Sequence, residues 1–421
     1  MTPEELLQAL DEEGDPEQLG IDWEKSEGDG KTPAFLTQNQ IIESLDWCGL
    51  EKSLAGPLIE MARLITRTPP LLRLARHCVW VVFENPESRE LHGHPRLESC
   101  LGDRAGHYYL LVCLAIVPFM REHHLRMNIP ESTTRETCRQ VHEYIDTYTA
   151  SHDGKAGVPA RRINWLRHYV REPYFRVGRL EYWLKPNPAP CHAYRHRRSG
   201  QMVVLMWDEQ KVAQEGYPVR DDYDGGYWIS EFSENDTAAN GYPISPDGSV
   251  VRKPVTLSFD EWEKVLKPGT QVLQIHIPAG ESVTPESLLE SKKEAIGFFA
   301  KHFPDAEPVA FETTSWMFSP LLEELLPPES NLVRYLSEVY VFPIESSPYG
   351  GLSFIFPEDD FDPATATRAT SLQGAILDHI ASGKPWRIGG MYMLLDDLKH
   401  YGSQHYRSTW KLSEFGQTKS M

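Results

Sequence analysis

Apolar residues recur in helical blocks over the N-terminal part of the chain. In the clearest block, Cys138, Val141 and Ile145 follow one another at spacings of three and four, after hydroxyl residues at 132–134 that can cap a helix. Other such blocks are Gln40–Leu50, Pro57–Ile65, Leu71–Phe83 and Tyr108–Leu125. The periodicity predicts a helical domain over residues 36–170.

The pattern changes to strand-like runs at Phe175. FRVGRLEYWL at 175–184 and MVVLMW at 202–207 are rich in aromatic and apolar residues, which predicts two strands paired as a hairpin. Residues 208–271 are rich in Gly, Asp, Asn and Pro, which is typical of loops. This stretch holds one predicted helix, Phe259–Leu266, which Ser258 can cap.

Strands and helices alternate in the remainder of the chain. The predicted strands are 272–278, 308–319, 339–344 and 351–356, and the predicted helices are Pro285–Phe303, a segment after Ser330, and Thr370–Ala381. We therefore expect an α+β protein, in which the helical domain is followed by a mixed-sheet domain with flanking helices over residues 171–410.

Composition places the chain among globular proteins. It has 421 residues, of which 40% are hydrophobic and 24% are charged, and this length suggests two or three domains. The longest uncharged run, Tyr108–Met120, is shorter than the roughly 20 residues that span a bilayer, so it predicts a buried helix.

Charge narrows the expected partners and location. The net charge of −19 argues against non-specific binding to nucleic acid or to an anionic membrane. The acidic residues at 1–35 predict a flexible, solvated N-terminal segment. The chain begins with acids where a secretory signal needs Lys or Arg, so we expect a cytoplasmic protein.

The cysteines predict neither disulfides nor a metal site. None of the six lies in a C-x-x-C pair, and most fall in apolar stretches, as small buried side chains do. The sequence also lacks the motifs G-x-x-x-x-G-K-[ST] and H-E-x-x-H and an EF-hand loop. We expect six free thiols and no bound metal.

One series of motifs carries a family resemblance. FRVGRLEY, ISPDGSV, VLQIHIPAGES, FFAKHFP, TTSWMFSP and PPESNL occur in this order. The most distinctive element is HIPAG at 276–280, followed by Ser291, Ala295, Phe298 and Phe299 in the pattern S-x-x-x-A-x-x-FF. The chain resembles a bacterial family of acyltransferase domain-containing proteins, which join a helical N-acyltransferase N-terminal domain to a GNAT-like C-terminal domain.

The resemblance implies transfer of an acyl group from acyl-CoA or a related carrier to an amine that the sequence does not identify. In GNAT enzymes the backbone of a splayed strand pairs with the pantetheine arm, and a loop and helix N-terminus hold the pyrophosphate. The strand VLQIHIP matches this place, which implies cofactor contacts from Ile275, Ile277, Ala279 and Gly280. Asn331 resembles an Asn that these enzymes often carry on the next helix.

Candidate catalytic residues lie on two predicted strands. The ordinary pKa of histidine suits a base at neutral pH, which makes His276 the first candidate, and Glu312 on the next strand could share a cleft with it. Glu181 is a third candidate, although structural pairing with Arg179 or Arg176 is the better explanation for it. The acid that protonates the leaving thiolate is not assigned, because Tyr335 and Tyr340 are only near the family's register.

Two hypotheses remain open at this point. The first is an N-acyltransferase acting on a small-molecule donor and acceptor. The second is a non-catalytic GNAT-like protein that binds small molecules or serves as a scaffold. The second hypothesis is kept because GNAT enzymes usually hold the pyrophosphate with a Q/R-x-x-G-x-G/A loop. Here only Gly280 of that loop is present, and Glu281 beside it would repel a pyrophosphate by like charge. We expect a cleft where strand 272–278 parts from strand 308–319.

Overall fold

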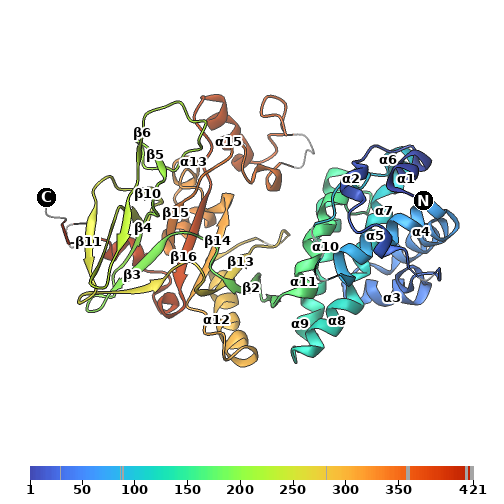
Figure 1. The fold of residues 1–421 in the computed structure, drawn as a ribbon, viewed down its shortest axis with the longest axis horizontal. Coiled ribbons are helices and arrows are strands. Elements are labelled where there is room, and N and C mark those ends of the chain that lie inside the picture. The colour runs from blue at the N-terminus through green and yellow to red at the C-terminus, as the bar shows by residue number, and fades with distance from the viewer. Residues whose placement is uncertain are drawn as a thin grey trace. The chain divides into compact units, whose positions relative to one another are not determined.

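The computed structural model describes residues 1–28, 30–85, 87, 90–280, 282–356, 361–412 and 416–417. The chain forms two compact units (Figure 1). Unit 1 comprises Met1–Val177 with Ile277–Glu281, and unit 2 comprises Gly178–His276 with Ser282–Met421.

Unit 1 is helical, as the periodicity predicted. Its helices are α1 (Pro3–Leu10), α2 (Pro16–Leu19), α3 (Gln38–Trp47), α4 (Ala55–Arg67), α5 (Pro69–Val79), α6 (Glu98–Leu101), α7 (Ala105–Leu114), α8 (Ile116–Arg126), α9 (Glu131–Cys138), α10 (Gln140–Ser151) and α11 (His168–Arg171). The unit ends in strand β1 (Tyr174–Val177). The helices bury the apolar face that the sequence pattern marks, for example Cys138, Val141 and Ile145 along α9 and α10.

The helical run Glu98–Arg126 is long and apolar enough to cross a membrane by length and composition. However, 72% of its most apolar stretch is buried inside the protein, as is typical of a core helix in a globular protein. α7 lies within this run and buries nearly all of its residues, including Tyr108 and Tyr109. The structure thus matches the buried helix expected for Tyr108–Met120.

The N-terminal residues differ from the flexible acidic segment that composition suggested. Thr2 caps α1 through a capping box with Glu5, and Asp15 caps α2. Leu6, Leu7 and Leu10 of α1 are buried, so this stretch has an apolar stripe that its high charge conceals. The apolar spacing, and not the net charge, is the signal that matches the structure of this stretch.

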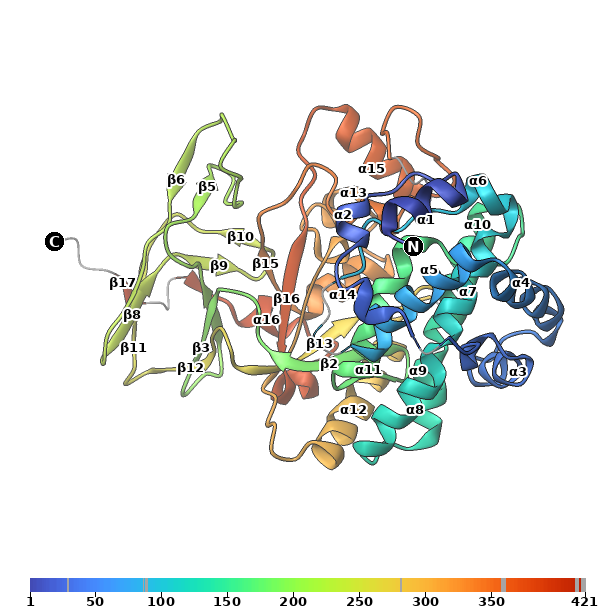
Figure 2. The same ribbon diagram turned by 45° about the vertical axis from the view of Figure 1, so that its right-hand side comes forward.

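Unit 2 is built on a mixed sheet with strands in the order β2-β13-β14-β16-β15. These strands are β2 (Leu180–Pro186), β13 (Gln271–His276), β14 (Ala310–Ser315), β15 (Tyr340–Pro343) and β16 (Gly389–Leu394). β13 and β14 are parallel, whereas the other neighbours in this order are antiparallel. Figure 2 shows β15 and β16 running side by side.

Helix α12 (Pro285–His302) connects the two parallel strands. Thr284 caps it through a capping box with Ser287, and Pro285 is its first residue. One face of the sheet is apolar and packs toward this helix, since the rings of Tyr182 and Phe299 lie 6.4 Å apart. The shorter helices of unit 2 are α13 (Leu322–Leu325), α14 (Asn331–Glu338), α15 (Ser371–Ala381) and α16 (His405–Thr409).

Smaller sheets complete unit 2. One has the order β10-β9-β4-β3-β12, another β17-β11-β8-β7, and a third pairs β5 with β6. Their strands are β3 (His192–His196), β4 (Met202–Leu205), β5 (Lys211–Ala213), β6 (Tyr227–Ile229), β7 (Phe232–Glu234), β8 (Ala238–Gly241), β9 (Pro243–Ser245), β10 (Ser249–Val250), β11 (Val255–Ser258), β12 (Trp262–Leu266) and β17 (Gly416–Gln417). The predicted α+β fold, helical and then mixed-sheet, is therefore confirmed.

Several predicted elements of unit 2 are wrong. Segment 259–266 is not a helix, because β12 pairs with β3 and buries Trp262 and Leu266. Segment 175–184 forms no hairpin with 202–207; β2 instead pairs with β13, and β4 pairs with β3 and β9. Residues Leu352–Phe354 form a 3-10 turn rather than a strand, after Gly351 at a φ of 74°. The sheet is completed instead by β16, which we did not predict.

Candidate active site

The second face of the main sheet is polar across four adjacent strands. We use the term polar face for the side of the sheet that carries Glu181 of β2, Gln274 and His276 of β13, Glu312 of β14 and Tyr392 of β16. The register places them together, because Glu181 opposes His276, and Glu312 lies between Gln274 and Tyr392. Residues directly opposite each other share one side of a sheet.

Glu312 is fully buried on the polar face. Its Oε2 accepts a hydrogen bond of 2.9 Å from Nε2 of Gln274. Its Oε1 has no hydrogen-bond partner among the residues that the structure describes. Burial raises the pKa of Glu312 to about 7, against the opposing effects of the Gln274 hydrogen bond and the Lys185 charge. This carboxyl group can therefore change its charge near neutral pH.

Gln274 connects the two residues that the sequence singled out. An ionised carboxylate only accepts hydrogen bonds, so Gln274 must turn its NH₂ group toward Glu312. Its Oε1 then faces Nε2 of His276 at 3.2 Å, and Nε2 must carry the hydrogen. In the neutral imidazole this leaves Nδ1 as the basic nitrogen. Sequence reasoning missed Gln274, although its place two residues before His276 already set both on one side of the strand.

The paired backbones of β13 and β14 part beside these side chains. Register pairs run from Val272 with Ala310 to Gln274 with Glu312 and then stop. Beyond that point β13 continues along β2 as far as His276, and β14 continues along β16 as far as Ser315. Two neighbouring parallel strands thus separate while each stays paired on its outer side, at the place where the family resemblance implies a splayed strand. The cleft expected there stays a prediction.

A second group of buried polar side chains lies next to Glu312. The hydroxyl of Tyr392 donates to Oδ1 of Asn187 at 3.3 Å and lies 3.4 Å from the sulfur of Cys191. Burial raises the pKa of Tyr392 well above its ordinary value, so this phenol stays protonated at neutral pH. On the other side of Gln274, the ring of Trp183 lies 6.5 Å from that of His276.

The predicted cofactor residues fall into three places. Ile275 is buried on the apolar face, opposite His276. Ile277, Ala279 and Gly280 follow β13, where Ala279 and Gly280 are exposed and Gly280 adopts a φ of 94° with open space beside it. Asn331 is exposed at the first residue of α14, which Ser330 caps. Glu281 lies outside the described residues. These assignments stay predictions.

Lys292 is a lysine buried inside unit 2. It lies on α12 with Nζ 3.1 Å from the hydroxyl of Tyr335, and no carboxylate among the described residues is within ion-pair distance. Burial lowers the pKa of Lys292 to about 7. Its spacing from the apolar Leu288, Ala295 and Phe299 places it on the inner face of the helix, and this spacing was the available signal.

The residues near the position of the acid in GNAT enzymes have different surroundings in the structure. Tyr340 has a structural role, since its hydroxyl donates to the carbonyl of Ile244 and accepts from the backbone of Val204. Glu338 accepts backbone hydrogen bonds from Gly402 and Gln404 instead of facing the polar face. Tyr335 is the partner of Lys292 and lies with it on the side of the sheet that α12 covers, away from the polar face.

Comparison with known families agrees with this arrangement of domains. Residues 39–171 match the N-acyltransferase N-terminal domain, and residues 174–393 match the GNAT-like C-terminal domain. The chain belongs to the family that joins these two domains. Both candidate catalytic residues of this GNAT-like protein, His276 and Glu312, lie in the region that matches the GNAT-like domain. A search of curated proteins found no match.

Solved structures share the fold of this GNAT-like protein over almost its whole length. An acyltransferase mutant in complex with octanoyl-CoA has 19% identity and a TM-score of 0.63, and the match covers 94% of this chain and 99% of that chain. An acyltransferase in complex with decanoyl-CoA and teicoplanin has the same identity and TM-score and covers 94% and 100%. A third, with decanoyl-CoA, has 20% identity and a TM-score of 0.58 and covers 93% and 99%.

Proposed function

We propose that this protein is an N-acyltransferase that moves an acyl group from acyl-CoA to an amine of a small-molecule acceptor. The observation that carries the proposal is the parting of β13 and β14 immediately after the Gln274–Glu312 pair. An extended ligand with amide groups can pair with backbone groups that neighbouring strands no longer share. The pantetheine arm of CoA is such a ligand, and its thioester would then lie near His276.

The chemistry assigned to the polar face follows from its hydrogen bonds. His276 takes a proton from the acceptor ammonium at Nδ1, because Gln274 holds the hydrogen on Nε2. The freed amine attacks the thioester carbonyl, a C–N bond forms, and the C–S bond breaks. The nitrogen then loses its second proton to water, and the imidazolium of His276 gives a proton to the departing thiolate. Glu312 positions Gln274, and its charge favours the imidazolium that His276 becomes.

Burial of Glu312 also favours a functional role over a structural one. A carboxyl group that must ionise inside the protein opposes folding, and a neutral amide of the same shape would not. Such a group is expected where its charge is used. Glu181, which opposes His276 in the register, provides a second buried carboxylate on the same face.

We propose medium-chain acyl-CoA and a peptide-like amine as the first substrates to test. The proposal rests on the structural neighbours, which were solved with octanoyl-CoA or decanoyl-CoA and in one case with teicoplanin. We also propose action in the bacterial cytoplasm, where acyl-CoA is made, without a metal cofactor in the transfer step.

The test is release of CoA thiol from octanoyl-CoA in the presence of a panel of amines, including a glycopeptide with a free amine. Replacing the base, His276→Gln, should lower kcat about 10²–10⁴-fold with little change in Tm. His302→Gln, on a half-exposed histidine near the end of α12, is the matched control and should keep full activity. Loss of Tm in proportion to activity would instead make His276 structural.

The non-catalytic alternative retains one supporting observation, the exposed Ala279–Gly280 loop with a single glycine. Under that alternative, acyl-CoA binds without turnover, and His276→Gln changes neither binding nor any acyl transfer. Acyl-CoA binding together with amine-dependent CoA release would exclude it.

A further inference from the structure

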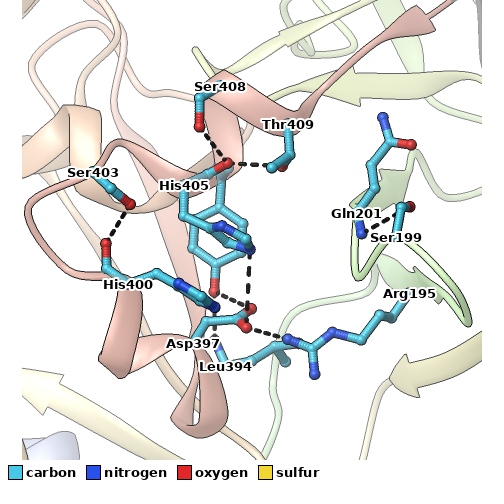
Figure 3. A network of polar contacts seen from close by, with 11 residues as sticks. Arg195, Ser199, Gln201, Leu394, Asp397, His400, Ser403, His405, Ser408 and Thr409 are labelled. Carbon is cyan, nitrogen blue, oxygen red and sulfur yellow. Dashed lines mark hydrogen bonds and ion pairs between the residues drawn. The ribbon is translucent and has the colours of Figure 1, made fainter.

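The chain that follows β16 brings three potential metal ligands together. Asp397 and His400 lie in the 3-10 segment Leu395–His400, and His405 begins α16. One ligand atom from each of the three side chains lies within 4.8 Å of the others. Figure 3 shows the two imidazole rings and the carboxylate converging from these two segments.

We propose that Asp397, His400 and His405 form a binding site for a Zn²⁺-type divalent ion. Two imidazoles and one carboxylate are a donor set that Zn²⁺ and the neighbouring 3d ions bind well. Three protein ligands leave one position for water. The sequence does not reveal this site, because its spacing D-x-x-H-x-x-x-x-H matches neither H-E-x-x-H nor an EF-hand loop.

Asp397 is held in place before any ion arrives. Its side chain is only 3% exposed, its Oδ1 is ion-paired with Arg195, and its Oδ2 accepts a hydrogen bond of 3.1 Å from the hydroxyl of Tyr406. The same hydroxyl accepts from the backbone of Leu394 at 2.8 Å. Outer hydrogen bonds of this kind orient a metal-binding carboxylate.

The loop between the two histidines is also built to fold back on itself. Gly402 and Gln404 both adopt left-handed backbone conformations, with φ values of 94° and 50°. Glu338 of α14 holds this turn by accepting from the backbone N–H of Gly402 at 2.6 Å. The turn stacks the ring of His405 on that of His400, with centroids 4.3 Å apart.

Binding needs the ligand atoms, which lie within 4.8 Å of one another, to move closer and the two stacked rings to turn so that their lone pairs meet at one point. Zn²⁺ with ligand bonds of about 2.0–2.2 Å places its ligand atoms roughly 3.4 Å apart. Nε2 of His405 is 4.0 Å from Oδ1 of Asp397, so this pair must close by about half an ångström. His400 and His405 are only half-buried, which leaves their rings room to turn.

Arg195 opposes a cation at the site but does not occupy it. A carboxylate oxygen has two lone-pair positions, so Oδ1 can accept from Arg195 and still face an ion. The nearby guanidinium charge reduces affinity, and we expect binding in the micromolar range.

The site lies away from the proposed acyl-transfer chemistry. Leu394, the last residue of β16, pairs with Ala310 at the start of β14, whereas β14 parts from β13 after Glu312. A bound ion would therefore link α16 to the segment after β16 and raise the stability of the folded protein.

The experiment uses the full chain, freed of metal with a chelator that is then removed. Co²⁺ should bind one ion per chain and give visible d–d absorption, and saturating Zn²⁺ should raise Tm by roughly 5–10 °C. Both effects should disappear in His400→Ala and His405→Ala and should persist in His92→Ala, a matched control on an exposed histidine.

Absence of d–d absorption and of a Tm shift in the wild-type protein would overturn the proposal. So would effects that need millimolar metal, or that survive in His400→Ala. Because neither readout involves acyl transfer, failure of the metal site and failure of the proposed enzyme function are distinguishable.

Discussion

Replacing Lys292 with methionine should stabilise this protein at neutral pH. Burial holds the pKa of Lys292 at about 7 in the folded protein, against an ordinary value of 10.5. At about 1.36 kcal/mol per pH unit, folding with this lysine charged costs about 5 kcal/mol. Lys292→Met removes that cost but leaves the hydroxyl of Tyr335 without its partner, which costs about 1–3 kcal/mol. The variant should therefore gain about 2–4 kcal/mol at about pH 6.

The pH dependence identifies the cause. Below about pH 7 the lysine is charged in both states, so the full penalty applies to the folded protein. From about pH 7 to 10.5 the unfolded chain binds more protons than the folded one, and the wild-type protein gains stability as pH rises. The advantage of Lys292→Met should shrink by about 4 kcal/mol between about pH 6 and pH 10.

Urea denaturation across this pH range measures the effect. Lys293→Met is the matched control, because Lys293 is the exposed neighbour on the same helix and should show a change within about 0.5 kcal/mol at every pH. A Lys292→Met variant that is less stable than wild type at pH 6, or a stability difference that does not vary with pH, would refute the reasoning.

Two further predictions concern other groups of the protein. Glu312→Gln should be more stable than wild type above about pH 7 but not below pH 4.5, because the raised pKa of Glu312 makes its ionisation oppose folding. Equal stability differences at pH 4 and pH 8 would contradict this. All six cysteines are free and five are buried, so a thiol reagent should modify Cys100 first and the others only after unfolding. Labelling of Cys100 should itself be slow, because burial raises its pKa to about 11, and fast labelling of several native thiols would contradict the prediction.

The sequence predicted the order of helical and sheet regions because apolar periodicity is local. Helix α12 and strands β13, β14 and β15 lie close to their predicted ranges for that reason. Segment 259–266 was misread because its strand is stabilised by pairing with β3, which lies far away in the chain. Strand β16 was missed because it begins with two glycines, which are rare in strands.

The candidate site could be predicted only in part for the same reason. Alternation along β13 sets the side of His276, but the register between β13 and β14 decides that Glu312 faces Gln274, and register is a property of the folded sheet. Lys292 shows the opposite case. Its helical spacing from Leu288, Ala295 and Phe299 is a local signal that indicates burial in spite of its charge.

Calorimetric titration of the full chain with octanoyl-CoA tests the central claim most directly. The account predicts saturable binding of one molecule per chain, weakened when Thr314 is replaced by proline, a residue that has no backbone N–H to offer the pantetheine arm. Thr314 lies beyond the last register pair of β14 with β13, and the alternation of pairs along β14 and β16 turns its N–H away from β16. Thr256→Pro on β11, in another sheet, is the matched control for the effect of proline on a strand. Absence of binding by acetyl-, octanoyl- and decanoyl-CoA in a folded wild-type protein would contradict the account.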